Sequence, residues 1–151
     1  MNRVTADLPD AVLFACRMNA VRSPMAAALM RRYFPGRVYV ESAGVHCGAL
    51  DPFAVAAMEE IGIDMSGHAP HSIAELHDTL FDLIVTLAPE AHHQALELTR
   101  TMAVKVEYWP TIDPTHAAGN REQRLQAYRA VRDELIRRVK ERFSWRPGPS
   151  V

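Results

Sequence analysis

Cysteine is scarce in this sequence, and long hydrophobic runs are missing from it. The chain of 151 residues has two cysteines, Cys16 and Cys47, so no disulfide framework is expected. Residues 1–10 lack the basic start and the apolar stretch of an export signal, and together with the few cysteines this predicts a reducing, cytoplasmic location. The longest apolar runs, such as residues 11–16, are far shorter than the roughly 18 residues that a bilayer span requires.

Neither sign of charge is in excess. Seventeen Lys and Arg residues stand against eighteen Asp and Glu residues, which leaves a net charge of -1 at pH 7. A chain with so little net charge creates no strong overall field, so we expect no nucleic-acid partner and no membrane partner. A small anion can still be bound locally.

A metal-binding pattern is also missing, although the chain has seven histidines. His92 and His93 are adjacent and would point to different sides of a helix, while His68 and His71 lack cysteines or carboxylates at ligand spacing. We therefore expect no metal and no other cofactor.

The length and the hydrophobic content, 48% of residues, are enough for one core and too little for two ordinary domains. We expect a single domain over residues 1–151, with residues 1–10 and 144–151 flexible.

Short apolar segments alternate with amphipathic segments along the chain. The predicted strands cover residues 11–16, 38–41, 82–87 and 104–108. Predicted helices begin at Ser23-Pro24 and at Asp51-Pro52, where a capping residue precedes proline, and two more cover residues 89–100 and about 125–143. This order predicts an α/β three-layer sandwich, in which a four-stranded parallel sheet has helices on both faces and a ligand site at the carboxyl ends of its strands.

Residues 16–23 carry the clearest chemical signal. They read Cys16, Arg17, Met18, Asn19, Ala20, Val21, Arg22, Ser23, which is a cysteine, five residues, an arginine and a serine between a strand and a helix. Such a loop can direct backbone N–H groups inward, while the helix adds the positive end of its dipole, so it can bind a phosphate, arsenate or sulfate anion. The same field favours a nucleophilic thiolate at Cys16, and the planar guanidinium of Arg22 can hold two oxygens of the anion. An isolated cysteine at a strand end is more often a small packed hydrophobe, but the flanking strand, Ser-Pro pair and helix favour chemistry here.

The segments around this loop resemble the low-molecular-weight protein tyrosine phosphatase superfamily, which includes thioredoxin-linked arsenate reductases. The resemblance covers most of the chain and is carried by residues 12–16, 22–26, 41–44, 62–64 with His68, 82–87, 109–110 and 113–114. It implies that Asn19, Ser23, Ser42 and His68 form a network that holds the loop, with Ser23 also donating to the Cys16 sulfur. It further implies that Asp113 is the general acid.

The chemistry of the residues agrees with that assignment of Asp113. Cleavage of a phosphoester by a thiolate leaves an alkoxide that must be protonated by a carboxyl group on a separate loop. The Asp113-Pro114 pair also suits a simple Asx turn, which is the structural alternative. We predict a cysteine-dependent phosphomonoesterase with a phosphocysteine intermediate, acting on a phosphorylated small molecule or a phosphoprotein.

The sequence departs from the family pattern at several positions. Met18 stands where the family usually has glycine, so a strained backbone is expected there. Thr115-His116 follows Asp113-Pro114, and residues 46–49 follow Ser42, in places where true tyrosine phosphatases have aromatic walls, so phosphotyrosine is expected to be a weaker ligand.

Two alternatives to the phosphatase stay open. The tail resembles the arsenate reductase branch, but Ala88 stands where that branch carries a cysteine, and Cys47 is the only other thiol, so a reductase would need an external thiol. The second alternative is a catalytically weak module that binds oxyanions and regulates.

Overall fold

The computed structural model describes residues 8–76 and 80–148. Its strands are β1 (Ala11–Cys16), β2 (Tyr39–Gly44), β3 (Leu83–Thr86) and β4 (Lys105–Tyr108). Its α-helices are α2 (Arg22–Tyr33), α3 (Pro52–Glu59), α4 (Pro89–Leu98) and α5 (Arg121–Arg142), and two short 3-10 helices are η1 (Ile73–Leu76) and η2 (Pro114–His116).

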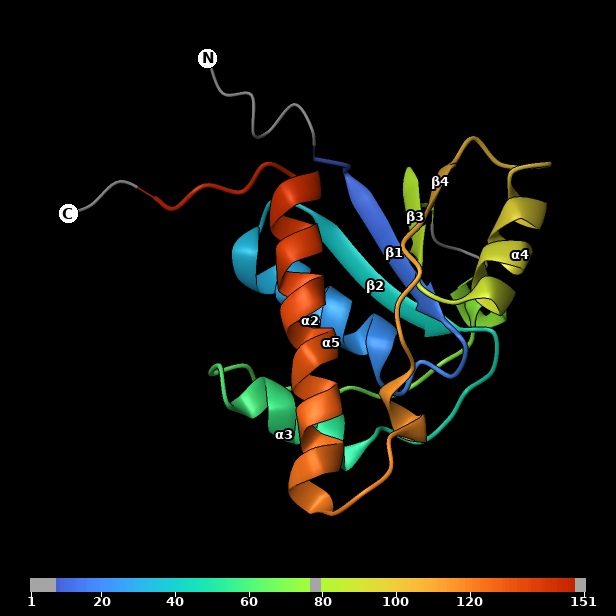
Figure 1. Cartoon of the computed structure of the whole chain (residues 1–151). Coiled ribbons are helices and arrows are strands. Elements are labelled where there is room, and N and C mark those ends of the chain that lie inside the picture. The colour runs from blue at the N-terminus through green and yellow to red at the C-terminus, as the bar shows by residue number, and fades with distance from the viewer. Residues whose placement is uncertain (1–7, 77–79, 149–151) are drawn as a thin grey trace.

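The four strands form one parallel sheet in the order β2-β1-β3-β4. Helices α2 and α5 cover one face with α3 beside them, and α4 covers the other face (Figure 1). The predicted α/β three-layer sandwich is confirmed. Strand β1 lies in the interior of the sheet, and its carboxyl end is the point where the chain order reverses, which is where open α/β sheets bind ligands.

Burial on both faces explains the unbroken apolar run in β1. Val12 and Phe14 pack into the core under α2 and α5, whereas Leu13 and Ala15 pack into the core under α4. All four side chains are at most 1% exposed. A strand covered on both sides needs apolar residues at every position rather than at alternate ones.

One predicted helix start is wrong. Helix α2 begins at Arg22, one residue before the predicted cap, and its N-cap Val21 makes no side-chain capping bond. Ser23 lies inside the first turn, and its hydroxyl bonds other groups of the site described below. The predicted cap at Asp51 is confirmed, since its carboxylate accepts a hydrogen bond of 2.8 Å from the backbone N–H of Phe53.

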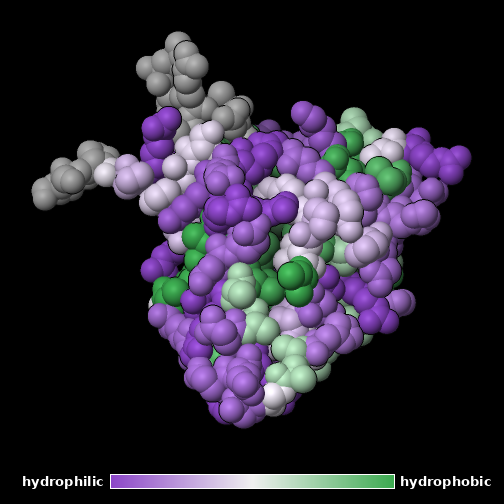
Figure 2. Space-filling model, in the orientation of Figure 1, coloured by the Kyte–Doolittle hydropathy of each residue, from purple (hydrophilic) through white to green (hydrophobic). Residues whose placement is uncertain are grey.

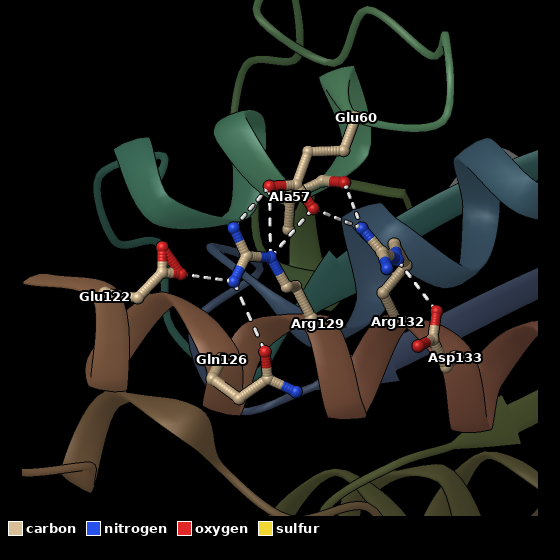
Figure 3. A network of polar contacts seen from close by, with 7 residues as sticks. All are labelled: Ala57, Glu60, Glu122, Gln126, Arg129, Arg132 and Asp133. Carbon is tan, nitrogen blue, oxygen red and sulfur yellow. Dashed lines mark hydrogen bonds and ion pairs between the residues drawn. The ribbon is translucent and has the colours of Figure 1, made fainter.

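A cluster of charged side chains ties α3 to α5 (Figure 3). Glu60, just after α3, pairs with Arg129 at 2.7 Å and with Arg132 at 2.8 Å, and Arg132 also donates to the carbonyl of Ala57 at 2.8 Å. Hydrogen bonds from Arg129, and then from Arg132, lower the pKa of Glu60 to about 2. This cluster fixes α3 against α5 beside the groove discussed below.

The predicted flexible termini fall partly on residues 1–7 and 149–151, which lie outside the described residues. Inside the predicted flexible tail, the ring of Trp145 packs against that of Tyr33 with centroids 5.2 Å apart. The single-domain assignment stays a prediction.

The surface shown in Figure 2 is largely hydrophilic. Hydrophobic atoms gather on it in a hollow between α5 and the segment after β4, lined in part by Ile112, Ala127 and Val131. Over residues 8–76 and 80–148, no helix is both long and apolar enough to cross a membrane.

Candidate active site

The loop after β1 is held open by the segment that follows β2. Backbone carbonyls of the loop accept hydrogen bonds from N–H groups within residues 45–51. The pairs are Val45 to Cys16 at 3.1 Å, His46 to Arg17 at 2.9 Å, Gly48 to Met18 at 2.9 Å and Asp51 to Ala20 at 3.2 Å. Because a peptide N–H and its C=O point in opposite directions, anchoring these carbonyls outward turns N–H groups of the loop inward.

The N–H groups of this loop have no acceptor of their own. Within the parts of the chain that the structure describes, no backbone N–H from Arg17 to Ser23 donates a hydrogen bond. Unpaired N–H groups are rare in a protein interior, and several of these residues are buried. A run of inward N–H groups at the start of a helix is a binding site for an anion.

Asn19 is the centre of a buried network behind this loop. Its Nδ2 donates to the hydroxyls of Ser23 at 2.8 Å and Ser42 at 3.0 Å. Its Oδ1 accepts from the backbone N–H of His71 at 3.0 Å and lies 2.9 Å from Nε2 of His68. Since Oδ1 is an acceptor, the proton of a neutral His68 lies on Nε2, and burial of the ring lowers the pKa of His68. The sequence did not indicate the part that the His71 backbone plays.

Ser23 connects this network to the sulfur. The Ser23 hydroxyl lies 3.0 Å from Sγ of Cys16 and 3.3 Å from the carbonyl oxygen of Ala43. The hydroxyl has one proton, which it donates either to the Ala43 carbonyl oxygen or to the sulfur, and a thiolate at Cys16 can only accept it. Cys16 is 2% exposed and stands at the carboxyl end of β1, so the sulfur lies at the floor of the site.

Arg22 is buried and held in place at its far end. Its Nη1 donates to the carbonyl of Thr111 at 3.0 Å, and its Nη2 lies 3.7 Å from the Asp113 carboxylate. The residue is 8% exposed, so its charge acts in a poorly solvated site. The segment after β4 therefore positions both Arg22 and the predicted acid.

The two carboxylate oxygens of Asp113 make different contacts. Its Oδ1 caps η2 by accepting from the Thr115 N–H at 3.0 Å and hydroxyl at 2.7 Å, which is the Asx turn considered from the sequence. Its Oδ2 is the oxygen that faces Arg22. Partial burial raises the pKa of Asp113, but the hydrogen bonds from Thr115 and the charge of Arg22 outweigh it, so the pKa lies below its ordinary value.

These groups enclose one small cavity of about 110 Å³, whose size suits an anion with little beyond it. It is lined by Cys16, Arg17, Met18, Ala20, Val21, Arg22, Asp113, Thr115 and His116. The structure thus brings the predicted nucleophile, cation and acid around a single pocket, with the Asn19 network behind it.

The strain expected at Met18 is absent, and that expectation was wrong. Among the described residues, Asn19 and Ser144 are the only ones other than glycine with a positive φ, and φ of Asn19 is 54°. Asparagine tolerates this left-handed conformation better than most residues. The glycine that the loop requires is Gly44, whose backbone packs so closely against the loop that an added Cβ would lie 2.7 Å from the backbone nitrogen of Asn19.

Comparison with known proteins agrees with this geometry. Residues 11–143 match the model of the low molecular weight phosphotyrosine protein phosphatase family. That match covers most of the chain. The chain belongs to this family.

Relatives within the family carry different activities in their names. An arsenate reductase of Bacillus subtilis is 36% identical over 130 residues, which cover 86% of this chain and 92% of the relative. A solved structure described as an arsenate reductase in the phosphate binding state has a TM-score of 0.71 and 28% identity, covering 89% of this chain and 97% of that one. The YwlE arginine phosphatase from Geobacillus stearothermophilus has a TM-score of 0.74 and 26% identity, covering 90% and 92%.

The two cysteines of the chain lie in different surroundings. Cys16 lies in the pocket, whereas Cys47 is exposed and its sulfur lies 3.0 Å from the carbonyl oxygen of Pro70. Ala88 is buried at the start of α4 and supplies no thiol. No cluster of three or more His, Cys, Asp or Glu residues suited to a metal is found in the described ranges.

Proposed function

We propose that this protein hydrolyses phosphomonoesters by covalent catalysis at Cys16. The observation that carries the proposal is the run of N–H groups from Arg17 to Ser23, which follows Cys16 directly, has no acceptor among the described residues and is buried from Val21 onward. Such a run, together with the charge of Arg22, complements a tetrahedral dianion better than any neutral ligand.

The reaction has two steps with balanced changes. The Cys16 thiolate attacks phosphorus in line with the ester bond, the S–P bond forms, the P–O bond breaks, and Asp113 protonates the departing oxygen. Asp113 then takes a proton from water, whose oxygen attacks the phosphocysteine, and the S–P bond breaks to restore the thiolate. The Ser23 hydroxyl stabilises the thiolate both before attack and after release.

The lowered pKa of Asp113 is compatible with its work as an acid. Arg22 is one cause of that low value. A bound dianion neutralises the field of Arg22 and repels the carboxylate, and both effects raise the pKa of Asp113 toward the protonated form that the first step needs. The second step needs the carboxylate, which is favoured again once the leaving group has gone.

Arsenate reduction by an external thiol is the second candidate, and the names of the sequence relatives favour it over hydrolysis. In that reaction Cys16 attacks arsenate with loss of water, and a second thiol attacks the Cys16 sulfur, which releases arsenite and leaves a disulfide. The two electrons come from the two thiols. Against an internal relay, Cys47 is the only other cysteine of the chain.

The pocket itself accommodates either chemistry, since phosphate, arsenate and sulfate share a tetrahedral shape and charge. We propose a phosphorylated small molecule or phosphoprotein as the substrate and the reducing cytoplasm as the place of action, because the thiolate must stay reduced. A regulatory module that binds an oxyanion without turnover is the remaining candidate.

The deciding experiment measures p-nitrophenyl phosphate hydrolysis from mildly acidic to neutral pH, with arsenate and glutathione as a parallel assay. Cys16→Ser is expected to abolish hydrolysis, and Asp113→Asn is expected to lower kcat about 10²- to 10⁴-fold. Asp64→Asn is the matched control, because Asp64 forms the same turn with Ser66, whose N–H it accepts at 2.9 Å, but lies outside the pocket.

Each outcome selects one candidate. Turnover that Cys16→Ser removes and Asp64→Asn leaves intact supports the phosphatase. Arsenite formed only with a thiol present, and no ester hydrolysis, assigns the reductase. Sulfate binding without either reaction leaves the regulatory module.

A further inference from the structure

A second hollow of about 470 Å³ opens beside the catalytic pocket. Met18, Ala20 and Thr115 line both, so the two hollows adjoin. The other residues that line this groove are Gly48, Ala49, Leu50, Asp51, Pro52, Phe53 and Arg124. We call it the leaving-group groove, because a phosphoryl group bound by the loop of residues 16–23 would extend the rest of its ester into it.

The floor of the leaving-group groove is apolar and rigidly fixed. Phe53 stacks on Tyr128 with ring centroids 5.3 Å apart and an interplanar angle of 25°. The Tyr128 hydroxyl donates to the second oxygen of Asp51 at 2.6 Å, while the first oxygen accepts from the Phe53 N–H. Both oxygens of the one carboxylate in the groove are therefore occupied by internal hydrogen bonds.

Two arginines at the start of α5 stand over this floor. The guanidinium carbon of Arg124 lies 4.8 Å from the centre of the Phe53 ring, and that of Arg121 lies 5.6 Å from it. Over residues 8–76 and 80–148, neither arginine forms an ion pair with a carboxylate. By contrast Arg129, further along α5, is paired with both Glu60 and Glu122.

Stacking on an aromatic ring orients a guanidinium but leaves its N–H groups free to donate. The positive end of the α5 dipole adds to the field at the same place. The far side of the leaving-group groove is consequently an ordered cationic edge facing an apolar floor.

We propose that the leaving-group groove selects phosphomonoesters whose leaving group carries a second anionic group, which Arg124 binds with help from Arg121. This inference rests on the hydrolysis proposed above. The second anion is a carboxylate or a second phosphate, carried either by a small molecule or by an acidic residue near a phosphorylated one in a peptide.

The test compares matched substrates. Phosphate esters of 4-hydroxyphenylalkanoic acids with short and long alkyl chains are paired with their primary amides, and p-nitrophenyl phosphate serves as the reference without a second anion. Each acid of suitable length is expected to have a kcat/KM about two- to fivefold above that of its amide at low salt. A phosphotyrosine peptide with a neighbouring glutamate, against the same peptide with glutamine, tells a peptide source from a small-molecule source.

The variants are designed to change this ratio. Arg121→Gln combined with Arg124→Gln is expected to reduce the ratio of acid to amide to about one, because the acids lose more kcat/KM than the amides and p-nitrophenyl phosphate, which carry no second anion. Arg100→Gln combined with Lys105→Gln removes the same charge from residues outside the groove and is expected to leave the ratio intact. An equal loss of ratio in both double variants would show a general charge effect and overturn the proposal, as would a ratio near one in the parent at every chain length.

Failure of the proposed hydrolysis is recognised separately, because then p-nitrophenyl phosphate is not turned over either. In that case calorimetric binding of the same acids and amides to the Cys16→Ser protein tests the leaving-group groove directly. Tighter binding of the acid, lost in the Arg121→Gln, Arg124→Gln variant, supports the groove; equal binding of acid and amide refutes it.

Discussion

Replacing Asn19 with alanine is expected to destabilise the protein more than almost any other single polar substitution. The side chain is fully buried and makes hydrogen bonds to two serine hydroxyls, to the His68 ring and to the His71 N–H. The hydroxyls of Ser23 and Ser42 can partly re-pair, but the His68 and His71 donors, which are part-buried, lose their acceptor. An unsatisfied buried group costs about 1–3 kcal/mol, and two part-buried donors that water still reaches in part cost roughly 2–4 kcal/mol.

Backbone conformation adds to this cost. At φ 54°, alanine is strained by about 1–2 kcal/mol, whereas glycine is not. Asn19→Ala should therefore lower the free energy of unfolding by about 3–6 kcal/mol, out of the about 5–15 kcal/mol of a typical domain. Asn19→Gly should lower it by about 1 kcal/mol less than alanine does.

Urea unfolding followed by circular dichroism measures the free energy of unfolding of both variants. Sulfate titration shows whether the loop of residues 16–23 still binds an anion. The control is Asn120→Ala, which removes an exposed N-cap bond and should cost only about 1 kcal/mol. A loss below about 1 kcal/mol for Asn19→Ala would refute the network argument. Equal stability of the alanine and glycine variants would refute the strain argument.

Further predictions concern the walls and the clamp of the site. Gly44→Ala should lower the free energy of unfolding in urea by about 1–3 kcal/mol and weaken sulfate binding, because the added Cβ would crowd the backbone of Asn19. Gly67→Ala is the control, since Gly67 has open space around it and should show neither effect. Equal effects of the two substitutions would contradict the packing argument. The pairing of Glu60 with Arg129 and Arg132 lowers the pKa of Glu60 from 4.5 to about 2. The stabilisation that this pairing gives is therefore complete at pH values above 4.5 and is lost as the pH falls from there toward 2. Glu60→Gln should flatten the fall in urea midpoint between about pH 5 and pH 3, and an unchanged slope would exclude this role. Ser23→Ala in a Cys47→Ser background should slow alkylation of the remaining thiol by iodoacetamide about tenfold at neutral pH, and an unchanged rate would show that the hydroxyl does not stabilise the thiolate.

Helix and strand order follow from local sequence here. The apolar run before Cys16, the capping residues with proline and the spacing of apolar residues in the last helix predicted the α/β sandwich, because periodicity and turn chemistry act over a few residues. The same local signals placed Cys16 at the carboxyl end of a strand and Arg22 where the following loop meets a helix. The predicted start of α2 was wrong, because Ser23 has the chemistry of a cap and only the tertiary structure directs its hydroxyl to the sulfur and to Asn19 instead.

What the sequence by itself determined is the loop motif and the layered fold around it. What only the tertiary structure decided is which distant groups meet at that loop. Residues 45–51 turn the N–H groups inward, Thr111 holds Arg22, and α3 meets α5 so that Arg124 stands over Phe53. These contacts join residues far apart in the chain, and no local propensity encodes them, because they form only when the sheet and its helices pack together.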